Sequence, residues 1–142
     1  MPLVCIPKLL RFVRRSKEHP DSATSYNNFG AVMRAMDDNV GALEMHNKAL
    51  AIRENVLGNE HPDTAESYNN IGAVMLAVGD DVGVLDMLNK ALAIYEKVLG
   101  NEHPDTAESY NNIGAVMLAV GDNVVALDML NKALPIYNNV LG

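Results

Sequence analysis

The sequence predicts an all-α fold, an α-solenoid of three similar helix pairs, and three observations lead to this prediction. A His-Pro pair recurs at His19, His61 and His103, which sets a repeat period of 42 residues. In each copy the apolar residues keep the spacing of one helix face. The chain has no run of alternating apolar and polar residues bounded by turn signals, the pattern of a strand. A fixed period of this length is typical of arrays in which each unit buries its apolar face against its neighbours.

The repeats fill the chain from Lys17 onward as copies 17–58, 59–100 and 101–142. The second and third copies are identical at 36 of 42 positions, whereas the first has diverged further. We therefore expect one array rather than separate domains.

The segment 1–16 precedes the first complete copy. Residues 8–17 nevertheless stand in the 42-residue register with residues 50–59, so that Arg11 matches Arg53. We predict that Leu9 to Arg15 form a short helix that covers the first repeat as a degenerate cap. The last copy stops at a repeat boundary without a polar capping helix, which favours a longer array or association through that end face.

The second copy illustrates the first helix of each pair. This helix is expected to begin near Pro62 and to end at Gly79, residue types that suit a helix start and a helix end. Asp63, with Glu66 three residues later, resembles a capping box. Between these ends one apolar face has the helical spacing i, i+3, i+4 and i+7, with Tyr68, Ile71, Gly72 and Met75.

A second apolar series predicts the partner helix, which starts after Asp80 and stops at Gly100. In the third copy Pro135 takes the place of Ala93 inside this helix. A proline in a helix interior removes one backbone hydrogen bond and crowds the preceding turn. We therefore expect the last helix to kink or fray beyond about Lys132.

Composition narrows the classes of function. Eighteen acidic against 11 basic side chains give a net charge of −7, which repels nucleic-acid backbones and anionic lipid headgroups. We expect neither nucleic acid nor a membrane as a partner, and no apolar run approaches the roughly 18–20 residues that span a bilayer. The single cysteine, Cys5, fits a reducing compartment, and we expect a cytoplasmic protein.

The repeated histidines are the obvious candidates for catalysis or metal binding. Packed helices lie about 8–10 Å apart, whereas two nitrogens on one zinc ion lie within roughly 4 Å of each other. We therefore interpret His19, His61 and His103 as residues that order the turn before each first helix. His46 lies on an apolar stripe and is interpreted as a packing residue. No nucleotide-binding, hydrolase or paired-cysteine motif occurs, so the sequence predicts neither an enzyme nor a cofactor.

The two helices together resemble the tetratricopeptide repeat. The first carries Tyr68-x-x-Ile71-Gly72-x-x-Met75 and the second carries Val84-x-x-x-Leu88-x-x-Ala91. The 42-residue length and the LGNEHPDTA linker resemble the kinesin-light-chain subtype. The resemblance implies a right-handed superhelical arc whose concave groove is lined by the first helix of each pair. It also implies a protein-binding scaffold or adaptor.

The asparagine pairs that recur in the first helices are the best candidates for a binding role. Asparagine is a mediocre helix former, so its presence in all three copies needs a reason. On a helical wheel Asn70 lies nearly opposite the buried side and Asn69 lies at the flank, where a bond to a neighbouring helix is the alternative. By the resemblance, the face opposite the core lines the groove. The predicted partner-binding residues are Asn28, Asn70 and Asn112, then Asn27, Asn69 and Asn111, together with Glu66, Glu108, Ala73 and Ala115.

Two functions remain open on the sequence. The leading hypothesis is a scaffold whose groove holds an extended, neutral or basic segment of a partner protein, because amides repeated along a groove pair with peptide N–H and C=O groups. The alternative is a structural array that associates with itself through apolar end faces, without a separate ligand. Light scattering over a concentration series separates the two.

Overall fold

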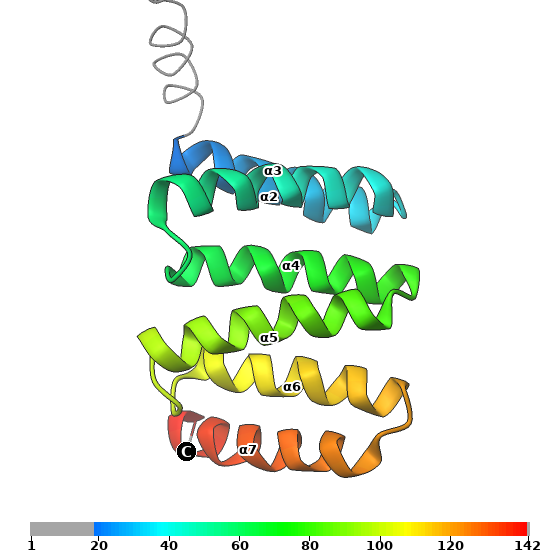
Figure 1. The fold of residues 1–142 in the computed structure, drawn as a ribbon, viewed down its shortest axis with the longest axis vertical. Coiled ribbons are helices and arrows are strands. Elements are labelled where there is room, and N and C mark those ends of the chain that lie inside the picture. Colours follow the sequence, from blue (N-terminus) through cyan, green and yellow to red (C-terminus); the bar gives the residue numbers. More distant parts are fainter. Residues whose placement is uncertain (1–18, 142) are drawn as a thin grey trace, which may run out of the picture.

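The computed structural model describes residues 19–141, and these form six α-helices with no strand in that range (Figure 1). The all-α prediction is confirmed. The predicted capping helix at Leu9 to Arg15 and the segment 1–16 lie outside the described residues. The helices are α2 (Pro20–Ala35), α3 (Asn39–Leu57), α4 (Pro62–Val78), α5 (Asp81–Val98), α6 (Pro104–Ala119) and α7 (Asn123–Leu141).

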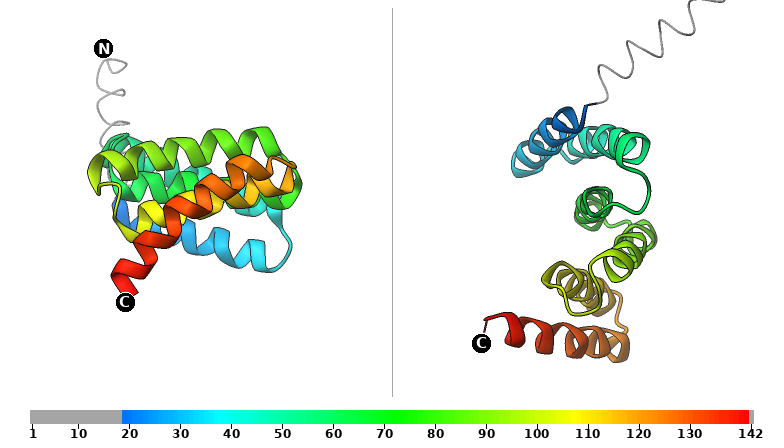
Figure 2. Two further views of the ribbon diagram at one scale, coloured as in Figure 1. Left: turned by 90° about the horizontal axis from the view of Figure 1, so that it is seen from below. Right: turned by 90° about the vertical axis from the view of Figure 1, so that its left-hand side faces the viewer.

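The helices stack as three antiparallel pairs along the long axis of the molecule, one pair in each 42-residue copy (Figures 1 and 2). Within the pairs α2 contacts α3, α4 contacts α5, and α6 contacts α7. Between the pairs α3 contacts α4 and α5 contacts α6. In the second and third pairs the first helix therefore packs against two second helices, its own partner and that of the preceding pair. This is the architecture of an α-solenoid.

Each first helix is capped by the histidine that precedes its proline. His61 is the N-cap of α4, and its side-chain Nδ1 accepts a hydrogen bond from the Asp63 backbone N–H at 3.0 Å. His19 and His103 make the same bond at the same distance. The interpretation of these histidines as turn-ordering residues is thereby confirmed. The expected capping box with Asp63 at its start is wrong, because the ring nitrogen already serves the free N–H group that such a box would satisfy.

The first helix of the second pair ends where the sequence predicts. Gly79 follows Val78 and adopts the left-handed conformation, with φ of 85° and ψ of 18°. A residue with a Cβ atom is strained in this conformation, so glycine is the usual choice at a helix C-terminus. Asp80 then caps α5 by accepting from the Gly83 N–H at 3.0 Å. Gly79 and Asp80 together make the tight connection between the two helices.

Small residues set the close contact within each pair. Ala65 of α4 and Ala91 of α5 are fully buried and pack together with Ile94 and Tyr95. Larger aliphatic residues fill the space between successive pairs, where Ile113 and Val116 of α6 pack against Val84 and Leu88 of α5. The core is therefore a continuous layer through the stack rather than one central cluster.

The last helix does not fray at its proline. The structure continues α7 to Leu141, nine residues beyond Lys132, so the expectation of fraying from Lys132 is wrong. Pro135 is exposed, whereas Ala133 and Ile136 on either side of it are buried against α6. Burial on the opposite face holds the chain helical and offsets the lost backbone hydrogen bond.

Candidate functional site

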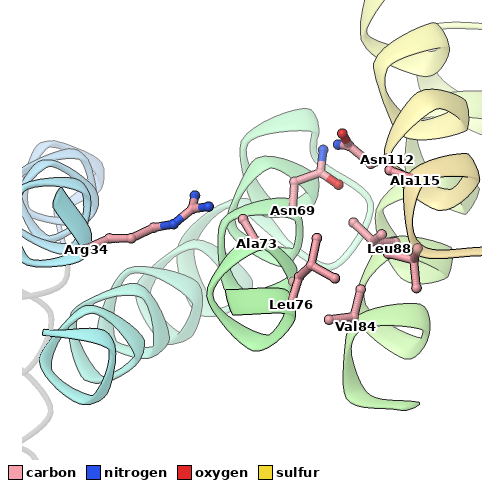
Figure 3. A pocket seen from close by; sticks show the side chains of 10 residues that line it. Arg34, Asn69, Ala73, Leu76, Val84, Leu88, Asn112 and Ala115 are labelled. Atoms are coloured by element: carbon pink, nitrogen blue, oxygen red, sulfur yellow. The ribbon is translucent and has the colours of Figure 1, made fainter. Parts of the chain in front are cut away.

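A cavity of about 280 Å³ lies in the groove between α4, α5 and α6. Its walls combine side-chain amides with aliphatic groups, and Figure 3 shows Asn69 and Asn112 directed toward each other from α4 and α6. Arg34 reaches toward the cavity from α2, and among residues 19–141 it is the only charged residue that lines it. The remaining lining residues are Gly72, Ala73, Leu76, Val84, Leu88, Ala115 and Val116.

The cavity brings together four of the residues that the sequence singled out. Asn69, Ala73, Asn112 and Ala115 line it. The second asparagine of the third copy therefore meets the first asparagine of the second copy, rather than its own equivalent. The other predicted residues do not line this cavity, and Asn28 lies instead at a separate hollow on α2. A binding role for any of these side chains stays a prediction.

The first asparagine of each pair meets a polar side chain of the second helix of its own pair, and in the second copy the Asn69 side chain interacts with the Tyr95 hydroxyl. Asn27 is 7% exposed, and its Oδ1 lies 3.1 Å from Nδ1 of His46. Asn111 donates to the hydroxyl of Tyr137 at 3.4 Å. In the second copy Oδ1 of Asn69 is buried and has no hydrogen-bond partner among the described residues. All three asparagines thus connect the two helices of a pair, and Asn69 also leaves an acceptor unpaired at the cavity.

A buried arginine joins the first and second pairs. Arg53 of α3 is 5% exposed, and its guanidinium donates to the Asp63 carbonyl oxygen at 2.9 Å and to Oγ of Ser67 at 3.0 Å. Glu66 lies 3.5 Å from the same guanidinium and also accepts from the Asn27 amide at 3.3 Å. Glu66, predicted to line the groove, thus contacts both Arg53 and Asn27 of the first pair, and its binding role stays a prediction.

His46 occupies the place where the later copies have leucine. It is 4% exposed and packs over Gly30. Burial, followed by the positive charges of Arg34 and Arg53, lowers the pKa of His46 below its ordinary value of 6.5. The imidazole is therefore neutral in the folded protein at pH 7, as expected of a packing residue.

This lowered pKa predicts a loss of stability in mild acid. The unfolded chain binds the proton more tightly than the folded chain, so the contribution of His46 is complete above about pH 6.5 and declines as the pH falls below that value. Between pH 7.5 and 5.5 the free energy of unfolding, measured with urea, should fall more steeply for the wild type than for His46→Leu. One proton limits the difference to about 1.4 kcal/mol per pH unit.

Arg34→Gln provides the matched test of the cause. It removes one of the charges that lower the pKa of His46 and leaves the ring in place, so its pH slope should fall between those of the wild type and His46→Leu. Equal slopes in all three proteins would show that His46 does not carry the pH dependence.

Part of the cavity wall was not predictable from the repeat pattern of one helix. Six residues outside the predicted site line the cavity, namely Arg34, Gly72, Leu76, Val84, Leu88 and Val116. One signal for Arg34 was present, because the second and third copies have Leu76 and Leu118 at its position. A charge that replaces leucine in one copy marks a local difference in the groove.

Comparison with known proteins agrees with the geometry. A sequence profile of the tetratricopeptide repeat matches residues 21–97 and 84–139. The chain belongs to the tetratricopeptide repeat family. Proteins with these repeats generally mediate interactions between proteins. A search of curated proteins found no match.

Solved structures include close matches in fold. BtubC (BKLC) from P. vanneervenii is 25% identical with a TM-score of 0.81, and the match covers 89% of this chain and 50% of that one. A putative kinesin light chain of Podosopora anserina with nearly identical TPR-like repeats is 23% identical with a TM-score of 0.79, covering 87% and 59%. The N-terminal domain of stress-induced protein-1 from C. elegans is 16% identical with a TM-score of 0.67, covering 83% and 86%.

These matches confirm the tetratricopeptide solenoid and the resemblance to kinesin-light-chain repeats. The chain spans only 50% and 59% of the lengths of the first two structures. Two further observations concern residues 19–141 alone. No helix in this range is long and apolar enough to cross a membrane, and no three His, Cys, Asp or Glu side chains gather there as a metal site would require.

Proposed function

We propose that this tetratricopeptide array is a cytoplasmic, non-catalytic scaffold whose groove binds an extended segment of a partner protein. The observation that carries the proposal is the cavity of about 280 Å³ between α4, α5 and α6. It is large enough to take one aliphatic side chain of a ligand. Leu76, Val84 and Leu88 supply the apolar part of its wall.

The two amides of the cavity favour a peptide over a purely apolar ligand. Asn69 and Asn112 each offer a donor and an acceptor, the pair of groups that an extended backbone needs. The unpaired Oδ1 of Asn69 supports this, since a buried acceptor without a partner costs about 1–3 kcal/mol. Rotation of the amide about its soft terminal torsion brings this oxygen to a ligand N–H.

The charge of the protein favours a neutral or basic ligand. The net charge is −7, and Glu108 is exposed on α6, one turn before Asn112. Arg34 adds a single local cation at the α2 side of the cavity. The segment in the cavity itself is therefore proposed to be uncharged, with any basic residues nearer the N-terminal ends of α4 and α6.

Peptide binding and one point mutation test the proposal. An array of 10-residue peptides is screened with the full chain, and the strongest binder is then measured by fluorescence polarisation. Asn112→Ala removes about one net hydrogen bond, worth about 1 kcal/mol, so the Kd should rise about fivefold. Asn89→Ala, an exposed asparagine of α5 away from the cavity, is the control and should leave the Kd unchanged.

Two outcomes would count against the groove. The first is that no peptide on the array shows saturable binding. The second is that Asn112→Ala and Asn89→Ala bind the selected peptide with the same Kd. Circular dichroism of both variants should show unchanged helix content, because neither side chain has a hydrogen bond in the described part of the chain that the fold requires.

Self-association is the second candidate function, and one observation favours it. The outer side of α7 exposes Leu127, Leu130 and Leu134 at 60%, 44% and 58%. In the preceding copy the equivalent residues of α5 pack against α6. Light scattering across a concentration series decides, since a protein that stays monomeric at high concentration excludes this alternative.

A further inference from the structure

The outward face of α2 is exposed where the equivalent faces of α4 and α6 are buried. Phe29 is 59% exposed and Val32 is 58% exposed. With Ser25 and Asn28 they line a shallow hollow of about 310 Å³. The residues at the same two positions in the later copies, none of them more than 2% exposed, are Ile71, Val74, Ile113 and Val116.

Inside the array this face always receives a helix. Ile113 and Val116 are covered by Val84 and Leu88 of α5, the second helix of the preceding pair. The face of α4 is covered in the same way by α3. No described helix precedes α2, so its face has the chemistry of an interface between pairs without an occupant in residues 19–141.

We propose that residues 8–17 of the same chain occupy this face, docked on α2 as the end of α3 docks on α4. The 42-residue register places Leu10 at the position of Ile52 and Arg11 at the position of Arg53. Arg53 binds the Asp63 carbonyl oxygen and Ser67. The residues 42 positions before Asp63 and Ser67 are Asp21 and Ser25, so the equivalent acceptors for Arg11 are the Asp21 carbonyl oxygen and the Ser25 hydroxyl. Ser25 lines the exposed hollow.

Charge complementarity favours this occupant. Residues 1–17 carry five basic side chains and no acidic one, a charge of +5. Residues 18–142 carry six basic against 18 acidic side chains, a charge of −12. The segment and the array therefore attract each other, and the attraction is strongest at low ionic strength.

The competing occupant is a second copy of the chain. Its α7 exposes leucines at the same repeat positions as the α5 leucines that pack against α6. The covalent connection of residues 8–17 to α2 favours that segment over a second copy. A segment joined to α2 by a short connection has an effective concentration in the millimolar range. A second copy also brings Tyr137 rather than an arginine to the acceptors of Asp21 and Ser25.

Two charge-matched variants of the full chain test the proposal. Arg11→Gln removes the arginine that corresponds to Arg53, whereas Arg14→Gln removes one that corresponds to Val56, a 45% exposed position. Arg11→Gln should lower the Tm by about 3 °C, the shift that the loss of about one buried hydrogen-bond pair gives in a chain of this size. Arg14→Gln should leave the Tm within about 1 °C of the wild type.

Limited trypsin digestion gives an independent measure of docking. Cleavage within residues 8–17 should be several-fold faster in Arg11→Gln, and in Phe29→Ser/Val32→Ser, than in the wild type. Equal Tm values for the two arginine variants together with wild-type cleavage rates would overturn the proposal. A Tm that rises with protein concentration, with Arg11→Gln and Arg14→Gln alike, would also overturn it and assign the face to a second copy.

Discussion

Replacing Gly30 by alanine is expected to lower the free energy of unfolding by about 2 kcal/mol, the range typical of an overpacked core. A Cβ atom at this position would lie 2.6 Å from Nε2 of His46. The ring has little freedom to move, because it is buried and bonded to Asn27. The pair α2–α3 must therefore separate locally or lose that hydrogen bond.

The same substitution in the other copies provides a graded control. At Gly72 the new Cβ would lie 3.1 Å from the flexible end of Leu88, and at Gly114 the nearest atom, the Ala126 carbonyl oxygen, is 3.4 Å away. Alanine is also favoured over glycine in a helix interior by about 0.8–1.0 kcal/mol. Gly114→Ala should therefore be neutral or slightly stabilising, and Gly72→Ala intermediate.

Urea unfolding of the three single variants under one set of conditions measures this order. His46→Leu/Gly30→Ala extends the test, because leucine at position 46 recreates the environment of Gly72. Gly30→Ala should lower the free energy of unfolding less when it is added to His46→Leu than when it is added to the wild type. Three equal effects would show that the contact with His46 does not set the spacing of the first pair.

The helices were predictable because their signals are local. His61, Gly79 and Asp80 fix the ends of α4 and the start of α5 through capping bonds to residues two or three positions away. The 42-residue period supplied the rest, since it requires every pair to pack in the same way. The local reasoning failed at Pro135, where burial of Ala133 and Ile136 outweighed propensity, and at the start of α4, where His61 rather than Asp63 is the N-cap.

The candidate site was predictable only in part, because it depends on packing between pairs. A helical wheel built on Tyr68, Ile71 and Met75 assumes a single buried side. In the structure Ser67 and Val74 are also buried, since α4 packs against α3 as well as α5. The contact of α4 with α3 covers part of the α4 face that was predicted to line the groove. Asn69 rather than Asn70 therefore lies at the cavity. Arg34 joins from another pair, which no single-helix pattern reveals.

Arg53→Ala should have the largest effect on stability, a loss of about 3 kcal/mol. The arginine is 5% exposed and its stem fills space between α3 and α4. Its removal leaves the Asp63 carbonyl oxygen and the Ser67 hydroxyl without the donor that now serves them. The Ser67 hydroxyl is fully buried, and a buried group left unpaired costs about 1–3 kcal/mol. The weakened contact with the partly buried Asp63 carbonyl and the lost packing of the stem add to this. Glu66 contributes little, because it is about half exposed.

The chain offers its own matched replacement for this arginine. Tyr95 and Tyr137 stand at the same position in the later copies, and Tyr95 is 5% exposed and packs with Ala65, Ala91 and Ile94. Burial, then the nearby carboxylates, raises the pKa of Tyr95, so its hydroxyl stays a neutral donor. Arg53→Tyr should therefore keep the volume and one donor, and lose less than half as much stability as Arg53→Ala. Chemical denaturation of both variants measures the difference. Equal losses would mean that the specific bonds to Asp63 and Ser67, rather than the filling of the interface, hold the first two pairs together.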